Sequence, residues 1–338
     1  MVTMQDVARR AGVTKQTVSN VVTGRVGVRP DTAARVRAAI DELGYVPNLV
    51  ARSLATGSTR TVGLFVPTVG TAFYADLVEE AEDALDEHGH HLLLCTTRQS
   101  GERARRHLAG LTSRSVDALL IAGDQDLLDH LPLLADARFP VALCAWETEA
   151  PERFPMVTVD YEKGGRLAGR HLRGLGHEHV VVLASPAHAR RVEGFRKAYA
   201  EDGGVVGEDV VRLVHEPSFP AAFEAARAAL TAHPAATALF ATHDVLATGA
   251  LEAARSVGRS VPDDLSVVAY DDCPAGPSSR PALTSVVLPR REMARDAVSL
   301  LLDAVAGREP STRHRMLAPE LVARDSSGPV RARGAATR

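Results

Sequence analysis

The stretch DVARRAGVTKQTVSNVVTG at residues 6–24 decides how the N-terminal part of the chain folds. Apolar side chains at positions 4, 7, 8 and 11 have the spacing of a short amphipathic helix, and Gly12 suits the left-handed conformation that ends one. Thr14 is a suitable N-cap for a second helix over residues 15–22, which presents a polar outer face. A third helix over residues 31–43 can cover this pair. The sequence therefore predicts a three-helix head that contains a helix-turn-helix.

The charge of the chain is distributed unevenly. Residues 1–60 contain nine Lys or Arg and four acids, which gives +5, whereas the whole chain carries −3, so the remainder carries −8. A small basic head on an acidic body is typical of proteins that bind nucleic acid. On this evidence alone, an ordinary helical hairpin with a solvated polar face remains an alternative.

Other features limit the class of protein. The sequence has no apolar run long enough to span a membrane and no signal peptide, so we expect a cytoplasmic protein. The three cysteines lie far apart in the sequence, so we expect buried reduced thiols rather than a disulfide framework or a metal site. The histidine groups at 88–91 and 177–179 lack the additional acid or cysteine ligands that a metal site requires. We find no nucleophile elbow, Walker loop, dinucleotide-binding glycine motif or zinc-protease motif. We therefore expect neither an enzyme nor a cofactor.

From residue 61 onward, apolar runs alternate with amphipathic segments, as a parallel α/β sheet requires. Ten such runs are too many for one compact sheet. They lie at residues 62–66, 92–95, 118–122, 141–145, 156–159, 180–184, 210–214, 238–241, 267–270 and 285–288.

The head motif followed by LGYVPNLVARSLATGSTRTVGLFVP at residues 43–67 closely resembles the LacI/GalR family of bacterial repressors. Later segments extend the resemblance, among them VTVDYEKGGRLAGRHLRGLGH, RRVEGFRKA, FATHDVLATGALEA and VPDDLSVVAYDD. The resemblance implies an all-α helix-turn-helix head followed by an α/β body with parallel sheets. This body would have two lobes, like a type I periplasmic binding protein.

The resemblance also implies the domain boundaries. A helix-turn-helix domain would span residues 1–46, and a hinge helix and linker residues 47–60. The two-lobed effector-binding and dimerisation domain would span 61–326, with lobe 1 at about 61–158 and 289–317 and lobe 2 at about 159–288. Residues 327–338, rich in Gly, Ala and Arg, would form a disordered tail.

Several residues of the head are implied to contact DNA. Lys15 and Gln16 take the two base-reading positions at the start of the second helix, and Gln can bond adenine bidentately. Asn20 stands where many relatives have an arginine that reads guanine, so the family's usual half-site is not expected. The other implied contacts in the head are Thr3, Thr14, Thr17, Ser19 and Arg25.

The hinge segment supplies a second set of implied DNA contacts. In the family it becomes helical when two chains meet on the operator, since so short a helix is unstable alone. Leu54 matches the leucine that wedges into the minor groove, where an apolar side chain unstacks and kinks the duplex. The other implied contacts here are Asn48, Ala51 and Arg52.

Open parallel sheets bind ligands beyond the carboxyl ends of their strands. The candidate effector-binding residues in these places are Phe73, Tyr74, Trp146, Asp160, Arg191, His243, Asp244 and Asp271. The family resemblance independently implies effector contact for all of them except Asp160 and Asp244. Arg191 begins a helix, where a cation opposes the macrodipole and needs another reason to be present.

Several of these candidates have structural alternatives. Phe73 and Tyr74 are also explained as core residues, Trp146 as a filler of the lobe interface, and Asp244 as an N-cap. His243 stands where many sugar-binding relatives have Asn, which leaves the effector's identity open.

The sequence thus predicts a DNA-binding transcriptional repressor under allosteric control of a small molecule. It would bind a palindromic operator as a homodimer or a tetramer. Aromatic rings beside an Arg and Asp pair suit a sugar or sugar derivative, and a nucleobase is the alternative. A solute-binding protein of a transport system shares the body fold but would need a signal peptide and would not carry the basic head.

Overall fold

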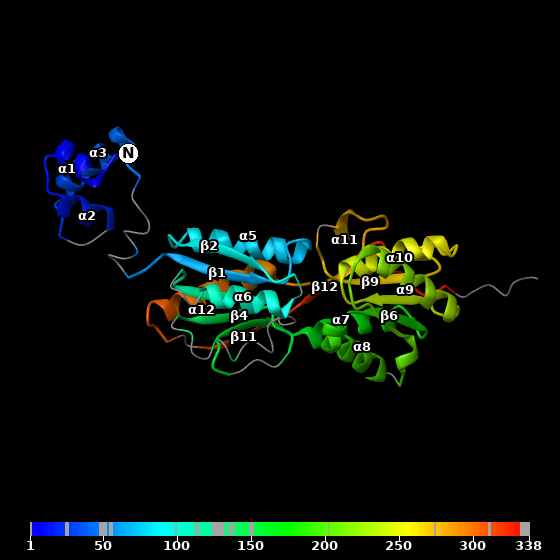
Figure 1. Ribbon diagram of the computed structural model, residues 1–338. Helices are drawn as coiled ribbons and strands as arrows, with labels where there is room; N and C mark the ends of the chain where they lie inside the picture. Colours follow the sequence, from blue (N-terminus) through cyan, green and yellow to red (C-terminus); the bar gives the residue numbers. More distant parts are fainter. Residues whose placement is uncertain are drawn as a thin grey trace, which may run out of the picture.

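The computed structural model describes residues 2–23, 27–46, 53, 57–98, 100–111, 115–123, 132, 134, 137, 139–148, 152–201, 203–273, 275–309 and 312–331. Within these residues the chain forms a helical head and two α/β lobes (Figure 1). No helix among them is both long and apolar enough to cross a bilayer.

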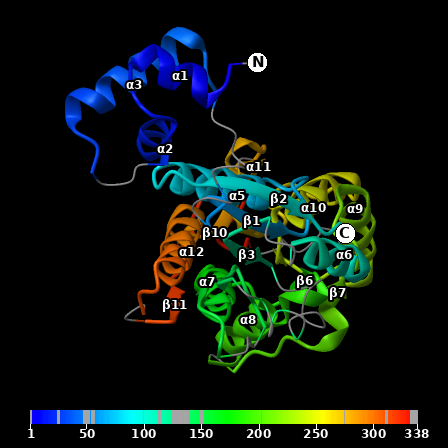
Figure 2. The same cartoon turned by 60° about the vertical axis from the view of Figure 1, so that its left-hand side comes forward.

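The head consists of α1 (Met4–Ala11), α2 (Lys15–Thr23) and α3 (Pro30–Leu43), seen from a second side in Figure 2. Gly12 ends α1 in the left-handed conformation, with φ of 65°. Val7, Val18 and Val36, one from each helix, are fully buried against one another. The structure confirms the predicted helix-turn-helix head, and α2 and α3 each extend one residue beyond the predicted range.

The first lobe is a six-stranded parallel sheet in the order β11-β5-β4-β3-β1-β2. Helices α5 and α12 pack on one face of this sheet and α6 on the other. The elements of lobe 1 are β1 (Thr61–Val66), α5 (Ala72–Asp86), β2 (His91–Thr96), α6 (Gly101–Leu111), β3 (Ala118–Ala122), β4 (Val141–Cys144), β5 (Met156–Val159), α12 (Arg290–Val305) and β11 (His314–Leu317).

The second lobe repeats this arrangement with the strand order β12-β10-β9-β8-β6-β7, in which only β12 is antiparallel. Helices α7 and α8 cover one face and α9 and α10 the other. The elements of lobe 2 are α7 (Tyr161–Gly174), β6 (Val180–Ala184), η2 (Pro186–His188), α8 (Ala189–Glu201), η3 (Glu208–Val210), β7 (Val211–Leu213), α9 (Phe219–Ala232), β8 (Ala238–Ala241), α10 (Asp244–Ser256), β9 (Ser266–Asp271), α11 (Ala275–Ser278), β10 (Thr284–Val287) and β12 (Glu320–Val322).

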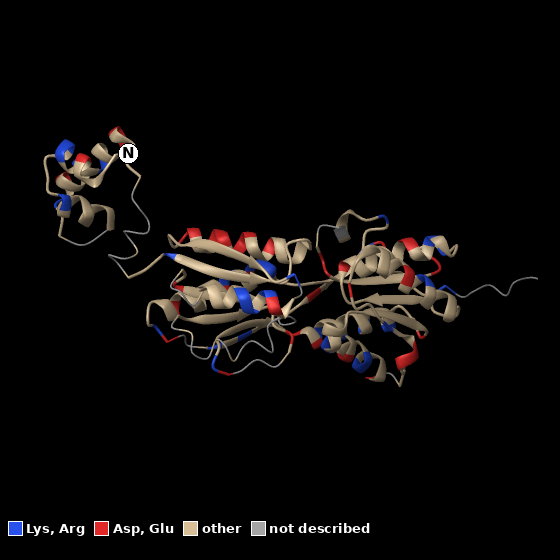
Figure 3. Cartoon of the chain, viewed as in Figure 1, with Lys and Arg blue, Asp and Glu red and all other residues tan. Residues whose placement is uncertain are grey.

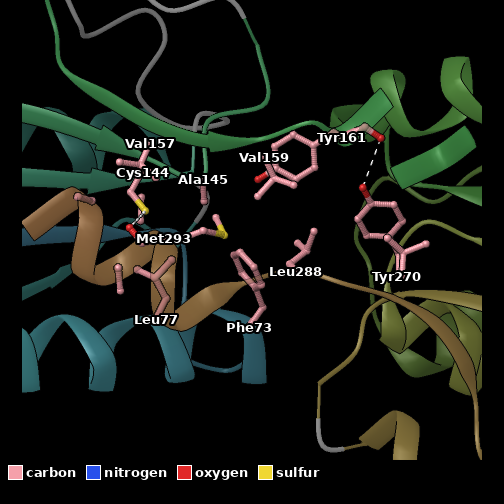
Figure 4. Packing of buried hydrophobic residues seen from close by; sticks show 14 of the residues in the cluster. Phe73, Leu77, Cys144, Ala145, Val157, Val159, Tyr161, Tyr270, Leu288 and Met293 are labelled. Atoms are coloured by element: carbon pink, nitrogen blue, oxygen red, sulfur yellow. Dashed lines mark hydrogen bonds between the residues drawn. The ribbon is translucent and has the colours of Figure 1, made fainter. Parts of the chain in front are cut away.

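The chain crosses between the lobes three times, after β5, after β10 and after β11. Apolar side chains from both lobes meet there in one buried cluster, part of which Figure 4 shows. Phe73 and Leu288 lie on the lobe 1 side of the boundary, and Tyr270 on the lobe 2 side donates a hydrogen bond to the carbonyl oxygen of Tyr161 (3.3 Å). The lobes therefore share a hydrophobic hinge region.

Two strands and one boundary differ from the sequence prediction. β11 and β12 were not predicted because they are edge strands without a continuous apolar run, and about half of their side chains are exposed. The disordered tail was predicted to begin at residue 327, but the amide of Val330 donates to the carbonyl oxygen of Leu175 (2.9 Å). Ser327 also bonds His171 (2.8 Å). Residues 327–331 thus contact lobe 2, which they extend beyond the predicted end of the body.

Candidate ligand cavity and nucleic-acid interface

A cavity lies between the two lobes at the carboxyl ends of their strands. The space inside it that a water-sized sphere can occupy is about 90 Å³, and the cavity opens to solvent at its mouth. Its walls are polar and aromatic. The lining residues are Pro67, Thr68, Thr71, Phe73, Tyr74, Ala145, Glu147, Tyr161, Ser185, His188, Arg191, Pro217, His243 and Asp271.

Arg191 lies at the centre of this cavity, in the first turn of α8, and joins the two lobes. Its Nε donates to Glu147 (3.2 Å to Oε2), and its Nη2 donates to the same oxygen (3.1 Å). Its Nη1 donates to the carbonyl oxygen of Thr242 (2.8 Å) and to Oδ1 of Asp271 (3.0 Å). Glu147 belongs to lobe 1 and Asp271 to lobe 2, so one guanidinium group holds carboxylates from both lobes.

Two tyrosine rings pack against the guanidinium group. The Cζ atom of Arg191 lies 4.3 Å from the ring centre of Tyr270 and 5.0 Å from that of Tyr161. Burial opposes the charge of Arg191, but Glu147 and Asp271 outweigh it and raise the pKa of its side chain. Burial also raises the pKa of both tyrosines well above the usual value, so their hydroxyls stay neutral. The rings and carboxylates together keep the arginine charged and fixed.

Close packing of α7 against α8 positions Arg191. A Cβ atom built on Gly165 would lie 1.9 Å from the carbonyl oxygen of Arg191, and one on Gly194 would lie 1.9 Å from that of Glu162. Only glycine permits backbones to approach this closely. Gly165 in YEKGGRLAG and Gly194 in RRVEGFRKA therefore determine where the arginine backbone lies.

Asp271, the last residue of β9, and Asp272 after it have an unusual backbone conformation. Both have positive φ, 88° and 54°, which is sparsely populated for residues other than glycine. Arg324 holds Asp272 in place with a two-pronged ion pair, and Arg290 donates to the carbonyl oxygens of both aspartates. Strained conformations maintained by surrounding contacts are common at functional sites, and here the strain turns Asp271 toward the arginine.

Two histidines complete the polar wall on the lobe 2 side. His188 and His243 stack with ring centres 6.1 Å apart, and Nε2 of His243 lies 3.7 Å from Oδ2 of Asp271. Nδ1 of His243 accepts from the amide of Val245, so Nε2 carries the proton that faces the aspartate. Burial lowers the pKa of both imidazoles, most strongly that of His188, and favours their neutral forms.

Phe73 and Tyr74, at the start of α5, lie where the sequence predicts. Both line the cavity, and their rings meet edge to face at 5.1 Å. Phe73 also belongs to the buried cluster between the lobes. Phe73 therefore has both of the roles considered for it: it is part of the hydrophobic core and it lines the cavity.

Asp160 and Asp244 do not line the cavity. Oδ1 of Asp160 accepts from the amide of Lys163 (2.8 Å) and caps α7. His243, rather than Asp244, caps α10, and Asp244 is buried with one carboxyl oxygen bonded to the amide of Cys273. Burial, with a contribution from Asp271, raises the pKa of Asp244 to about 8. The effector contacts predicted for these two acids are thus not supported by their positions.

Trp146 is likewise absent from the cavity, and its predicted role as an effector contact does not fit its position. Along β4, odd-numbered residues face α6 and even-numbered residues face α5 and α12. Ala145 has a positive φ of 52°, which shifts this alternation by one residue. Trp146 therefore enters the core beneath α6, where it is 1% exposed, and Glu147 faces the cavity instead.

Sequence reasoning missed Glu147 and Tyr161 as cavity residues. Tyr161 directly follows Asp160, which the sequence predicts as a cavity residue, and it is the first residue of α7. This position was the signal that could have identified Tyr161 as a cavity residue. Nothing in the sequence indicates the left-handed turn at Ala145, so the exchange of Trp146 for Glu147 could not be inferred.

The second site is the outer face of α2 in the head. Lys15 and Gln16 are exposed there, and Gln16 donates a side-chain hydrogen bond to Asn20 one turn later (3.0 Å). Ser19 and Thr17 are partly exposed on the same helix. The two predicted base readers, Gln16 and Asn20, are thus neighbours whose amide groups present donors and acceptors together.

Two predicted DNA contacts also stabilise the helices themselves. Thr3 and Asp6 form a capping box at the start of α1. Oγ1 of Thr14 accepts from the amide of Thr17 (3.1 Å) and begins α2, as the sequence predicts. The remaining predicted contacts lie outside the described residues: Arg25, Asn48, Ala51, Arg52 and Leu54.

Comparison with known proteins yields two family matches. Residues 3–48 match the family of bacterial regulatory proteins, lacI family, and residues 169–327 match the periplasmic binding protein-like domain. The HTH-type transcriptional repressor PurR of Photobacterium profundum is 33% identical over 333 residues, which cover 96% of this chain and 98% of that protein.

Two solved structures are also similar over nearly their whole length. The transcriptional regulator CelR in complex with cellobiose is 32% identical, with a TM-score of 0.73 and coverage of 96% of this chain and 100% of that one. The lac repressor dimer bound to operator and the anti-inducer ONPF is 27% identical, with a TM-score of 0.84 and coverage of 97% and 99%. With the helix-turn-helix head, the two-lobed body and these similarities, the chain belongs to the LacI family of DNA-binding transcriptional regulators.

Proposed function

We propose that the protein is a repressor whose affinity for a palindromic operator is set by a sugar or sugar derivative bound between the lobes. The contacts of Arg191 are the observation that supports the proposed binding of a small-molecule effector. A guanidinium group and the carboxylate of Asp271 lie 3.0 Å apart in a buried cavity, beside the rings of Phe73 and Tyr74. Such a pair can donate to and accept from adjacent hydroxyl groups, and the rings can stack on a sugar's apolar face.

The comparison with the CelR complex supports a carbohydrate, because that regulator was solved with cellobiose and is similar over 96% of this chain. His243 places an N–H donor on the cavity wall beside Asp271, and the position of this donor would affect which sugars can bind. Whether the ligand releases the operator or strengthens its binding depends on which lobe arrangement the operator-bound dimer prefers. By linkage, each ligand changes the affinity of the other by the same factor.

The proposed operator contacts come from the exposed face of α2 and from the hinge. Lys15, Gln16 and Asn20 would enter the major groove, and Leu54 would wedge into the minor groove at the centre of the site. A single head reads one half-site, so a palindrome requires two chains. The lac repressor structure that resembles this chain over 97% of its length is a dimer on its operator.

Lobe 1 is the proposed dimer surface. Leu93 and Leu94 are 38% and 39% exposed on β2, the edge strand of the first sheet. Helix α5 next to it presents a row of acidic residues, seen in Figure 3. Arg290, on α12, binds Asp76 of α5 (2.9 Å) and also the carbonyl oxygens of Asp271 and Asp272. Arg290 therefore connects the two aspartates at the cavity directly to α5, the helix beside the proposed interface.

The test measures operator binding with and without a panel of sugars and of nucleobases. Arg191→Ala and Asp271→Ala should each abolish the response to the active compound and leave operator binding intact, because neither residue lies in the head. Each lost charge-assisted hydrogen bond contributes about 1.5–3 kcal/mol, so affinity for the compound should fall at least tenfold. Arg190→Ala is the matched control, since Arg190 is exposed beside Arg191 and does not line the cavity.

Three results would contradict the proposal. If both variants respond like wild type, the cavity does not bind the effector. If both variants lose operator binding and also unfold at a much lower temperature than wild type, these residues maintain the fold rather than bind a ligand. A response to nucleobases but to no sugar would replace the sugar with the alternative ligand class.

A further inference from the structure

The cavity between the lobes contains more carboxylate than cation. Glu147 and Asp271 both bond to Arg191, which is the one permanent cation among the described residues that line the cavity. The buried imidazoles of His188 and His243 are neutral near pH 7, because burial lowers their pKa values. These three permanent charges therefore leave the cavity with a net charge of about −1.

Most of the N–H groups of the arginine already have partners. Nε–H and one N–H of Nη2 donate to Glu147, the two N–H groups of Nη1 donate to Asp271 and to the carbonyl oxygen of Thr242, and the rings of Tyr161 and Tyr270 pack against the guanidinium group. An incoming carboxylate or phosphate would face two carboxylates and a cation that is already neutralised. Repulsion between like charges is strong at such sites, because little water screens it.

We propose that Glu147 determines the charge of the ligand, so that the cavity admits an uncharged or amine-bearing polyhydroxy compound and rejects carboxylates and phosphates. The proposal rests on the ligand-binding function proposed above and narrows its substrate class. An ammonium group would neutralise the excess carboxylate, and the neighbouring aromatic rings offer cation–π contacts to it. A sugar acid or a sugar phosphate would have to displace Glu147 from Arg191.

The first experiment tests whether the carboxylate of Glu147 occupies the place beside Arg191 where a free anion would otherwise bind. It requires no known effector. Thermal denaturation of the full chain is followed with increasing acetate at constant ionic strength. Wild type should show no saturable response. Glu147→Ala should gain one, with a rise in Tm of roughly 2–4 °C or more, because acetate can replace the lost carboxylate. Glu147→Ser is measured alongside as a second, more polar truncation that leaves the same space for acetate, should the alanine variant not fold.

Matched controls assign the response to this position. Glu152→Ala removes an exposed acid from the same connection without touching the cavity, and it should behave as wild type. Adding Arg191→Met to Glu147→Ala should abolish the acetate response, which excludes binding to the basic head. Equal stabilisation of wild type by acetate would overturn the proposal, and so would the absence of a response in both Glu147 variants.

The second experiment compares ligands that share one sugar ring and carry a neutral, a cationic or an anionic group. Calorimetry with glucose, glucosamine, glucuronate and glucose 6-phosphate, and with the corresponding galactose series, measures binding to wild type and to Glu147→Gln. In wild type no acidic member should bind more tightly than its uncharged parent, and Glu147→Gln should reduce the discrimination against the acid at least tenfold. A sugar acid or phosphate that binds wild type more tightly than its parent would overturn the charge rule. A sugar that binds but leaves operator affinity unchanged would refute the regulatory function alone.

Discussion

Gly165→Ala tests whether the close contact between α7 and α8 positions Arg191 in the proposed effector cavity. The added Cβ atom would lie 1.9 Å from the carbonyl oxygen of Arg191, whereas ordinary contact begins at about 3.4 Å. The start of α8 would therefore have to move by about 1.5 Å. Forced repacking of this kind costs about 1–3 kcal/mol, and the better helix propensity of alanine offsets about 1 kcal/mol of it.

Gly174→Ala is the matched control on the same helix. No atom lies within 4 Å of a Cβ atom at Gly174, which ends α7. This substitution should therefore be neutral or stabilise by up to about 1 kcal/mol, because alanine restricts the unfolded chain. The free energy of unfolding should separate the two variants by roughly 1–3 kcal/mol.

Thermal denaturation followed by circular dichroism measures this difference as a Tm for Gly165→Ala several degrees below that of Gly174→Ala. Ligand affinity should also fall in Gly165→Ala alone, since Arg191 moves away from Glu147 and Asp271. If the two variants unfold at the same temperature, the helices are not held at this distance by the glycine. If stability falls but ligand affinity does not, the contact does not position the arginine.

Three further predictions concern the buried acid and the DNA contacts. Burial raises the pKa of Asp244 to about 8, so the folded chain binds this proton more tightly than the unfolded chain, and wild-type stability should fall as pH rises from about 4 to 8. Asp244→Asn should remove that part of the pH dependence, and parallel Tm profiles of the two proteins would show the assignment to be wrong. Asn20→Arg should shift preference toward guanine at one position per half-site by about 1–3 kcal/mol in a randomised operator library, whereas an unchanged profile would mean that Asn20 reads no base. Leu54→Ala should weaken operator binding more than binding to random DNA at the same salt concentration, because phosphate contacts survive the loss of the wedge, and equal losses would count against it.

The architecture could be predicted from the sequence because buried parallel strands leave a clear apolar pattern. All ten predicted strands are present, and each agrees with its predicted range to within one residue at either end. β11 (HRML) and β12 (ELV) escaped prediction because they are short and lack a continuous apolar run. The family resemblance was still needed to divide the strands between two lobes, because strand order depends on contacts distant in the sequence.

The cavity was predictable in its position but only partly in its residues. The rule that ligands bind beyond the carboxyl ends of strands correctly placed Phe73, Tyr74, Arg191, His243 and Asp271 on the cavity wall. It cannot specify which way a side chain turns once the strand has ended. A single left-handed residue after β4 reversed the roles of the next two side chains, and caps such as Asp160 satisfy local backbone groups instead of a ligand.

The buried charges between the lobes are better explained by switching than by stability. The side chains of Arg191, Glu147 and Asp271 are at most 7% exposed, and desolvating three charges costs several kcal/mol for each ion. Apolar residues of similar volume would hold the lobes together at least as well. An ion pair differs from an apolar contact in that it tolerates only a small range of distances and angles. A movement of one lobe by a few ångströms therefore breaks it. Because Glu147 comes from lobe 1 and Arg191 from lobe 2, the geometry of this pair depends on how the two lobes are arranged. A ligand that bonds to Arg191 and Asp271 would therefore act on a contact that is sensitive to the lobe arrangement, which is the differential interaction that the proposed allosteric control requires.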